Sequence, residues 1–391
     1  MKRVIQRLIH WGTTYEPLIT VTVSKNAILH NLGQFQSLIG EKKIAPVLKS
    51  NAYGHSLEQM AELLDPLHFP FFAVDSYYEA LTLRRDGIKT PILIIGYTYP
   101  DTVVSNSLAN ISFAVTSNDL LTELIDKIPF EKKNPLKIHL KIDTGMRRLG
   151  IMPEEVPGII NILKNNRQIV LEGIYTHLSD ADGEKKDFTH EQIEVWNKIT
   201  EQFKKEFSGT LKYLHASASA GHIFSEKIDS NVFRLGIGLY GLTTSKEISE
   251  KISLRPALEL VSVISGIKKI KKGDKVGYNG TYTAPNDMTI ATIPVGYNEG
   301  LDRRLSNVGF VKITAETGAS HHFCPIIGRV SMNITTIDVT EVPHLKSKDK
   351  VVIFSSHKTD KNSIEETARI CGTIPYDILV HIPQHLRRTL I

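Results

Sequence analysis

Lys49 has the surroundings most typical of a reactive side chain. The apolar run Ala45-Pro46-Val47-Leu48 ends at this lysine, and the small, turn-prone segment Ser50-Asn51-Ala52-Tyr53-Gly54 follows it. The pattern predicts an amine at the carboxyl end of a strand, where partial burial favours the neutral, nucleophilic form. Such lysines commonly form Schiff bases with carbonyl compounds, including the aldehyde of pyridoxal phosphate. A surface lysine that closes an edge strand is the alternative.

Other polar residues stand at the same relative place, just after an apolar run. They are Asp75, Asp143 with Arg148, His177, and His215 with Ser217 and Ser219. In a barrel the carboxyl ends of the strands share one rim, so these side chains would converge there. We therefore expect a catalytic or binding site at this rim. Unrelated polar residues at strand ends are the alternative.

The elements that must position these residues alternate along the first part of the chain. Between about residues 19 and 241, apolar β-rich runs are separated by segments of helical periodicity. Several runs are continuously apolar, which indicates burial on both faces. About eight βα units match the size of a (β/α)8 barrel, and a doubly wound open sheet is the alternative. The expected strands are 19–23, 44–48, 71–74, 92–95, 111–115, 136–142, 169–175 and 211–214, and the expected helices are 26–38, 57–64, 77–85, 118–128, 156–163 and 191–207.

The rhythm changes after Leu254-Arg255-Pro256, where short runs are separated by Gly, Asn, Asp and Pro. This pattern is typical of an all-β domain of sandwich or barrel type. We therefore predict an α/β protein: a (β/α)8 barrel at 1–255 with a short N-terminal extension, followed by a mostly-β domain at 256–391. The expected strands of the second domain are 257–264, 288–294, 310–315, 326–332, 334–339 and 351–354, with one helix at 363–371.

Composition limits the class of partner. The 47 Lys and Arg residues exceed the 42 Asp and Glu residues by only 5, which does not indicate a nucleic-acid-binding protein. Cys324 and Cys371 form no spaced framework, so a reducing cytoplasm is expected. Residues 1–15 lack the apolar core of a secretory signal, and no run is long enough to span a bilayer. No metal site is expected, since the pairs His321-His322 and His381 with His385 have no acidic or cysteine ligand beside them.

Five blocks resemble signatures of the alanine racemase family, in family order and at compatible spacing. The resemblance extends from about residue 20 nearly to the C-terminus, and it implies a pyridoxal-phosphate barrel, a β domain and a homodimer with shared active sites. It also implies interconversion of L- and D-alanine, with D-alanine supplied for peptidoglycan. The blocks are Lys49-Ser50-Asn51-Ala52-Tyr53-Gly54-His55, Lys141 to Gly150, Val276 to Tyr282, Pro294-Val295-Gly296-Tyr297 and Gly328-Arg329-Val330-Ser331-Met332.

The resemblance assigns two catalytic bases. Lys49 is similar to the family's Schiff-base lysine, which also exchanges a proton on one face of Cα. Tyr278 is similar to the second base, which the partner subunit delivers to the opposite face; a strand-edge aromatic is the alternative. Racemisation needs proton transfer on both faces, which one rigid group cannot serve. His177 resembles the histidine beside that tyrosine and could offer it a cationic or hydrogen-bonding contact.

The resemblance also assigns contacts to the cofactor. Arg234 resembles the arginine that donates to the pyridine nitrogen, and His215 the histidine that orients it; a salt bridge at the barrel rim is the alternative for Arg234. A guanidinium does not release its proton, so the ring would stay unprotonated and would be a weaker electron sink. The phosphate contacts implied by the family are Tyr53, Ser219, Gly236 and Ile237.

On the substrate side, the resemblance implies that Arg148 contacts the cofactor's phenolic oxygen and the substrate carboxylate. Met332 would offer its backbone amide to that carboxylate from the other subunit, and Tyr297 would restrict side-chain size. Lys141 matches a lysine that many members carry as a carbamate; an unmodified Lys141–Asp143 pair is the alternative.

Three positions depart from the family pattern. Ala218 replaces an asparagine before the phosphate serine, Asn333 replaces an aspartate after Met332, and Gln384 stands where some members have a phosphate-binding tyrosine. These changes leave both bases intact and bear on phosphate affinity and substrate choice. A serine or broad-specificity racemase, and a non-catalytic pyridoxal-phosphate carrier, are the alternative functions.

Overall fold

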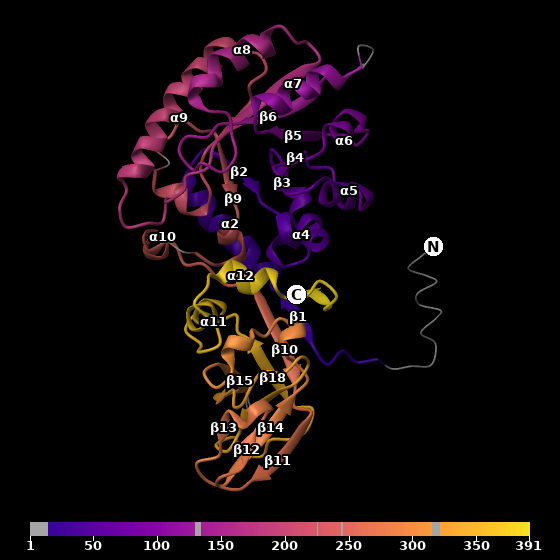
Figure 1. The fold of residues 1–391 in the computed structure, drawn as a ribbon, viewed down its shortest axis with the longest axis vertical. Coiled ribbons are helices and arrows are strands. Elements are labelled where there is room, and N and C mark those ends of the chain that lie inside the picture. Colours follow the sequence, from indigo (N-terminus) through magenta and orange to yellow (C-terminus); the bar gives the residue numbers. More distant parts are fainter. Residues whose placement is uncertain (1–14, 130–133, 225, 244, 315–320) are drawn as a thin grey trace.

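The first part of the chain closes into a parallel barrel. The computed structural model describes residues 15–129, 134–224, 226–243, 245–314 and 321–391, and Figure 1 shows the barrel at one end of the molecule and the mostly-β region at the other. The barrel strands are β2 (Lys43–Pro46), β3 (Phe72–Val74), β4 (Ile92–Ile94), β5 (Ile111–Val115), β6 (Leu136–Lys141), β7 (Ile169–Tyr175), β8 (Tyr213–His215) and β9 (Val232–Leu235).

Three sets of contacts complete the ring. Strands β3 to β8 form one parallel sheet in sequence order, and β2 pairs in parallel with β9. Val47 bridges to Ala73 beside β3. The backbone N–H groups of Asn231 and Arg234 donate to the carbonyls of Leu214 and Ser217 and so join β9 to β8. The predicted (β/α)8 barrel is confirmed, and the open sheet is excluded.

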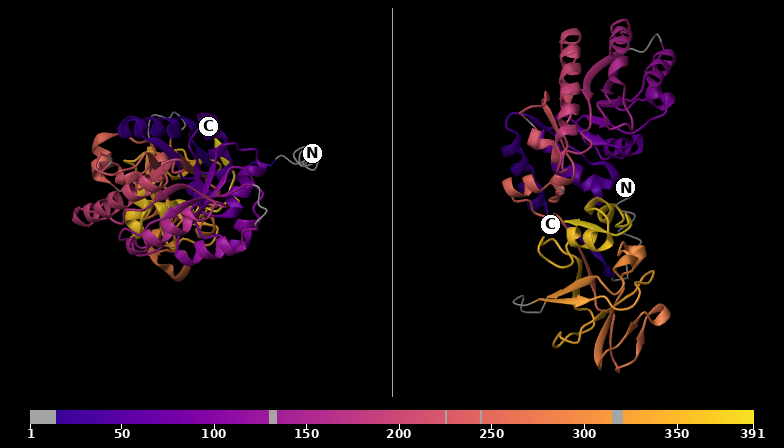
Figure 2. Two further views of the ribbon diagram at one scale, coloured as in Figure 1. Left: turned by 90° about the horizontal axis from the view of Figure 1, so that it is seen from above. Right: turned by 60° about the vertical axis from the view of Figure 1, so that its left-hand side comes forward.

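Helices cover the outside of the barrel (Figure 2). Because β3, β4 and β5 are buried at every position, the apolar runs that predicted them were the correct signal. Serine side chains cap the amino ends of several helices by accepting a backbone N–H bond. The helices are α2 (Lys25–Ile39), α3 (Lys49–Tyr53), α4 (Leu57–Leu64), α5 (Tyr77–Arg85), α6 (Pro100–Ser105), α7 (Asn118–Lys127), α8 (Val156–Lys164), α9 (Asp187–Glu206) and α10 (Lys246–Lys251).

One expected barrel strand belongs to the other sheet. The run at 19–23 does form a strand, β1 (Thr20–Val23), but it pairs with β10 (Leu258–Val263) and β19 (Arg388–Leu390) of the second region. Its alternating sequence and alternating burial are those of a strand covered on one face only. The remaining barrel strand is β9, which the periodicity analysis missed. The division at residue 255 stays a prediction, except that β1 pairs with strands of the second region and not with the barrel.

In the second region, the described residues form three sheets. A six-stranded sheet has the order β16-β15-β18-β10-β1-β19, a three-stranded sheet the order β11-β14-β17, and β12 pairs with β13. The expected helix at 363–371 is confirmed as α11 (Ile364–Cys371), whereas the expected strand at 326–332 is wrong: Gly328 there has a φ of +72°, and only Ile326 makes a bridge. The other elements are β11 (Gly266–Ile270), β12 (Lys275–Val276), β13 (Tyr282–Thr283), β14 (Met288–Ile293), β15 (Phe310–Thr314), β16 (His321–Pro325), β17 (Thr335–Asp338), β18 (Lys350–Phe354) and α12 (Pro375–Val380).

Helix α12 packs against the loop that carries Lys49. Gly54 ends that loop with a φ of +81°, and a Cβ at this position would collide with the carbonyl of Leu379 in α12. Arg388 donates from Nε to the carbonyl of Gly54 over 3.0 Å. The C-terminal segment therefore holds the loop after β2 from the side of the second region. Within the described part of the chain, no helix has the length and apolarity to cross a membrane.

Candidate active site

A cavity of about 550 Å³ opens at the carboxyl ends of the barrel strands. Active sites of this fold lie at that end. Most of the predicted site residues line the cavity, whereas Tyr278, Tyr297 and Met332 do not, and His215 lies behind it in the barrel interior. The predicted residues that line the cavity are Lys49, Tyr53, Lys141, Arg148, His177, Ser219, Arg234, Gly236 and Ile237.

A left-handed turn presents Lys49 to the cavity. Ser50, Asn51, Ala52 and Tyr53 all have φ between 51° and 56°, a conformation that disfavours residues with a Cβ. The turn is held by Asn51, whose N–H donates to Glu79 and whose Oδ1 accepts from the N–H of Leu57. Among the described residues, no hydrogen bond or ion pair engages Lys49 Nζ, so the amine is available to a ligand.

Arg234 is held rigidly with one donor left over. Its Nη1 donates to Nδ1 of His215 over 2.9 Å and to the carbonyl of the same residue. Its Nη2 donates to the carbonyls of Thr176 and Ala216. Burial lowers the pKa of Arg234 to about 10, so it stays cationic at neutral pH. Because no described residue accepts from Nε–H, this donor is available to a ligand in the cavity.

Burial and nearby cations also lower the pKa values of His177 and Lys141, which both line the cavity. Burial, followed by the charges of Arg234 and Arg148, lowers the pKa of His177 to about 3. Burial and Arg148 lower the pKa of Lys141 to about 8, and no ion pair joins Lys141 to Asp143 in the part of the chain that the structure describes. His177 is therefore neutral at pH 7, and any contact it makes with a tyrosine is a hydrogen bond rather than a cationic one.

These buried imidazoles predict a marked acid sensitivity. Burial lowers the pKa of His55 to about 4 and that of His139 to about 3, as it does for His177. The unfolded chain binds protons on these groups near pH 6.5, so their stabilising contribution is present above that pH and is lost as the pH falls toward 3. The urea midpoint should therefore decrease steadily between pH 6.5 and 4.5.

The control for this prediction is His55→Asn, whose amide can donate to the carbonyls of Ala52 and Tyr53 that now accept from Nδ1. Unfolding of this variant should take up about one proton fewer than unfolding of the wild type over the same pH range. A wild-type midpoint that does not change between pH 6.5 and 4.5 would contradict the assignment of neutral buried histidines.

One part of the cavity wall suits an anion. Ser219 Oγ accepts from the N–H of Gly238 over 3.2 Å, so its own proton is free to donate. The hydroxyl of Tyr53 lies beside Gly236, where a Cβ would approach it to 2.9 Å. Absence of a side chain at Gly236 thus keeps the backbone open to a ligand next to two hydroxyl donors.

Tyr376 is a lining residue that the sequence analysis did not assign to the site. It lies near the start of α12, and its ring centroid is 5.9 Å from that of Tyr53. Burial raises the pKa of Tyr376 to about 12, so the phenol stays protonated as a donor. Gln384, which occupies the position of the missing tyrosine, is exposed and does not line the cavity.

The remaining predicted residues sit together on the second region. Tyr278 begins a 3₁₀ turn between β12 and β13, and its side chain is 68% exposed. In Figure 1, β12 and β13 lie at the end of the molecule away from the barrel. Tyr297 and Met332 are 44% and 56% exposed. One chain therefore does not bring Tyr278 to Lys49.

Glu299 ties the segments of Tyr297 and Met332 together. Its carboxylate accepts from the N–H of Gly296 over 2.8 Å and from the amide of Asn333 over 2.6 Å, while the N–H of Asn298 donates to the carbonyl of Met332. An aspartate at 333 would place a second carboxylate against Glu299. The asparagine at this position therefore fits its neighbour in this chain.

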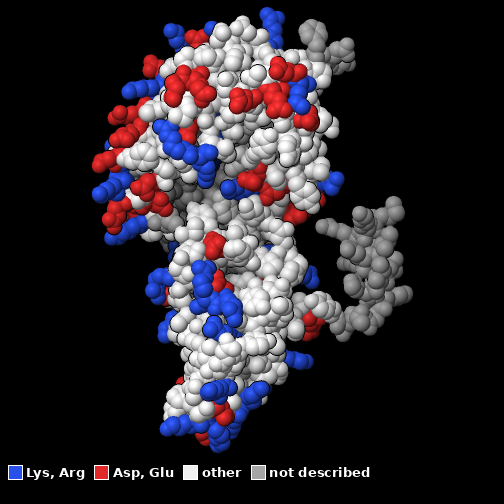
Figure 3. All heavy atoms as spheres, viewed as in Figure 1, with Lys and Arg blue, Asp and Glu red and all other residues white. Residues whose placement is uncertain are grey.

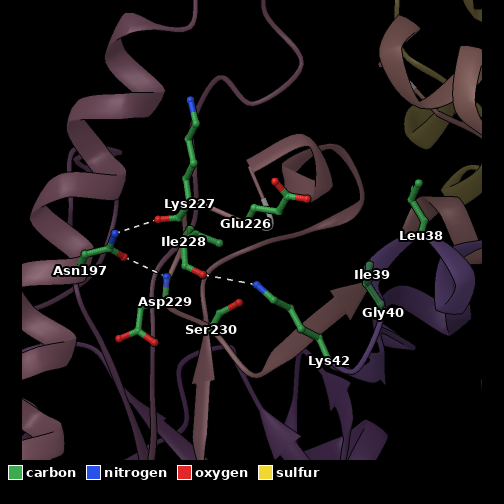
Figure 4. Close-up of a pocket in the computed structure, with 10 residues that line it drawn as sticks. All are labelled: Leu38, Ile39, Gly40, Lys42, Asn197, Glu226, Lys227, Ile228, Asp229 and Ser230. Carbon is green, nitrogen blue, oxygen red and sulfur yellow. Dashed lines mark hydrogen bonds between the residues drawn. The ribbon is translucent and has the colours of Figure 1, made fainter.

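A second hollow lies at the opposite, amino ends of β2 and β9 (Figure 4). Its polar groups bond to one another: the amide of Asn197 contacts the carbonyl of Lys227 and the N–H of Asp229, and Lys42 Nζ donates to the carbonyl of Ile228. This arrangement is typical of a structural network. On the face in Figure 3, charges of both signs are interspersed over the barrel, which does not form a single-sign surface for a polyanion.

Comparison with known proteins agrees with this geometry. Residues 23–244 match the model of the alanine racemase N-terminal domain, and residues 257–390 match that of the C-terminal domain. The chain is 33% identical to alanine racemase 1 of Caldanaerobacter subterraneus subsp. tengcongensis over 94% of this chain and 93% of that protein.

Solved structures extend the comparison. The alanine racemase of Clostridium difficile 630 superposes with a TM-score of 0.88 at 28% identity, covering 97% of each chain. The histidine racemase of Leuconostoc mesenteroides subsp. sake gives a TM-score of 0.85 at 26% identity, over 97% of this chain and 99% of that one. With both domain models matched and the barrel cavity built around Lys49 and Arg234, the chain belongs to the alanine racemase family of pyridoxal-phosphate-dependent racemases.

Proposed function

We propose that this protein interconverts L- and D-alanine with pyridoxal phosphate bound in the barrel cavity. The observation that carries the proposal is the unpaired amine of Lys49 in the same cavity as the free Nε–H of Arg234. The residues present fit that cofactor: an amine for its aldehyde, a donor for its ring nitrogen, and hydroxyls and a glycine turn for its phosphate. When bound, the cofactor supplies a conjugated ring that accommodates the electron pair left when Cα loses its proton.

Lys49 and Tyr278 of the partner subunit would act as the two bases. Lys49 receives or returns the Cα proton on the face it occupies, and the phenol of residue 278 serves the other face. The exposure of Tyr278 and its absence from its own chain's cavity support delivery from a second copy. The neutral imidazole of His177 would then hydrogen-bond to the phenol. Each dimer would contain two shared sites.

Arg148 and Lys141 would form the substrate-carboxylate side. Arg148 lines the cavity and carries the positive charge that a carboxylate requires. With a pKa of about 8, part of the Lys141 population is neutral at physiological pH. The neutral amine can add to CO₂ and release one proton, which yields a carbamate anion able to position Arg148. We propose this modification for Lys141.

Removing the hydroxyl of Tyr376 should weaken cofactor binding. We expect Tyr376→Phe to raise the Kd of the apoenzyme for pyridoxal phosphate about tenfold or more, the effect of one hydrogen bond to a charged group. Fluorescence titration measures this Kd, and inorganic phosphate can serve as a competitor. Tyr77→Phe is the matched control, because Tyr77 donates to Asn106 outside the cavity. Equal Kd values for the two variants would show that the hydroxyl of Tyr376 does not contribute to cofactor binding.

The substrate is tested by comparing racemisation of alanine, serine and histidine by the purified protein. The alternative of a broader or different substrate is kept because a histidine racemase has the same fold at 26% identity. A higher kcat/KM for histidine or serine than for alanine would overturn the alanine assignment. Deuterium exchange from solvent into Cα of alanine excludes a non-catalytic carrier. Growth of a D-alanine auxotroph on this gene would support supply of D-alanine for peptidoglycan.

A further inference from the structure

Two imidazoles occupy the interior of the barrel, beneath Arg234. Barrel interiors are ordinarily filled by branched aliphatic side chains. Here Nδ1 of His139 on β6 lies 2.8 Å from Nε2 of His215 on β8, and the two residues are 1% and 0% exposed. Such a pair is costly to bury unless each nitrogen has a defined role. Neither the family comparison nor the sequence motifs assign His139 any role.

The surroundings are shaped to hold this pair. His139 stands opposite Gly173 in the register of β6 and β7, and a Cβ at Gly173 would come within 2.6 Å of His139 Nδ1. Tyr213 stacks on His139 at 5.6 Å, and Tyr175 stacks on His215 at 5.0 Å with an interplanar angle of 2°. Glycine on one side and aromatic rings on the others leave each imidazole little freedom to rotate.

The hydrogen bonds determine which nitrogens carry protons. Arg234 has no acceptor atoms, so it donates to Nδ1 of His215, and this nitrogen must be unprotonated. A neutral His215 then carries its proton on Nε2, from which it donates to Nδ1 of His139. His139 in turn must carry its proton on its own Nε2. The order of donors is thus Arg234 to His215 and His215 to His139.

Charges around the pair keep it neutral. Burial lowers the pKa of both imidazoles, and the cation of Arg234 lowers them further. Glu172 acts in the opposite direction on His139, but its carboxylate is engaged by Ser112, Lys137 and Lys212. His139 and Glu172 line a cavity of about 160 Å³ together with polar residues such as Ser112 and Lys212, and this volume is large enough for a water molecule that accepts from the remaining N–H.

We propose that His139 is a positioning residue that keeps His215 in its Nε2–H tautomer, so that His215 accepts from Arg234 and holds the free Nε–H of the guanidinium toward the cofactor ring. The role of His139 in the reaction rests on the proposed function, whereas the tautomer itself does not. Without the acceptor on His139, the Nδ1–H tautomer of His215 would become competitive, and its proton would oppose the donor of Arg234.

The first test is the tautomeric state of the apoenzyme. Long-range ¹H–¹⁵N spectra of protein labelled at histidine nitrogens, recorded at pH 7.5, distinguish protonated from unprotonated ring nitrogens. The expected result is Nε2–H with unprotonated Nδ1 for both His139 and His215. A protonated Nδ1 on either residue would overturn the proposal whether or not the protein racemises alanine. Failure of racemisation with the expected spectrum would instead refute the proposed function alone.

The second test compares two substitutions of His139. His139→Asn retains an acceptor, Oδ1, near the position of Nδ1, whereas His139→Leu keeps an apolar volume and removes the acceptor. His139→Leu should lower kcat about tenfold with little change in KM, and its His215 should show protonated Nδ1; His139→Asn should retain the tautomer and stay within about threefold of wild type. An equal loss of kcat in both variants, with an unchanged His215 tautomer, would show that His139 acts only through packing and would overturn the proposal. If His139→Leu does not fold, the spectra of the wild type and of His139→Asn still test the proposal, because a protonated Nδ1 on His215 in either protein would overturn it.

Discussion

Replacing Lys49 by alanine should abolish racemisation and covalent cofactor binding together. The substitution removes the only group that the proposal assigns both to the cofactor aldehyde and to one face of Cα. General base catalysis alone accounts for about 10²- to 10⁴-fold, so a decrease in kcat of at least about a thousandfold is expected. The yellow absorbance band of the bound cofactor should disappear at the same time. Borohydride reduction of the wild type, followed by peptide mapping, should locate the cofactor on the peptide that contains Lys49.

The matched control is Lys43→Ala. Lys43 is the exposed first residue of β2, the strand that precedes Lys49, and its side chain is not among those that line the cavity. This variant should keep the band and the rate. Circular dichroism and gel filtration must show that both variants fold and assemble as the wild type does. If Lys49→Ala retained a reducible cofactor bond elsewhere on the chain, the assignment of Lys49 would be wrong.

Tyr278→Phe should stop turnover in the homodimer and restore it on mixing with Lys49→Ala. The phenylalanine variant keeps Lys49 and the cofactor but has no acceptor on the second face, so a rate loss of about a hundredfold or more is expected. In a mixed dimer, one site combines the intact lysine with Tyr278 of the partner subunit, and the other site lacks both. Since a two-fold dimer has two equivalent sites, the mixed dimer should have about half the wild-type activity.

Two controls make the mixing experiment specific. Tyr282→Phe removes a phenol from the same hairpin, but that hydroxyl contacts Met288 within its own chain, so its rate should stay near wild type. Mixing two Lys49→Ala preparations should give no recovery. Absence of recovery from subunits shown by mass spectrometry to have exchanged would contradict a site shared between protomers. An active monomer would contradict it as well.

The barrel could be anticipated from the sequence because burial on both faces leaves a local signal. The continuous apolar runs at 92–95 and 111–115 correspond to β4 and β5, which are buried at every position. The same reasoning placed Lys49, Arg148 and His177 at one rim, since parallel strands end at a common edge, and all three line the cavity. The roles proposed for these residues rest on the family resemblance.

Other features could not be predicted because they depend on contacts between distant segments. Periodicity reports that Thr20–Val23 is a strand, but not that its partners are β10 and β19. Tyr376 joins the cavity only because α12 packs against the loop after β2, more than three hundred residues earlier in the chain. His139 looks like an ordinary polar residue within a strand until the ring of β-strands brings it to His215.

The amino-acid sequence by itself determined the alternation of buried runs, the two structural regions and the position of Lys49 after a strand, because these depend on neighbours within a few turns of chain. Only the tertiary structure decided which sheet each strand joins, that Tyr376 lines the cavity, and that Tyr278 lies outside the cavity of its own chain. Those outcomes depend on which surfaces pack together although they are far apart in the sequence. The periodicity of side chains along one segment gives no information about the surface that it packs against.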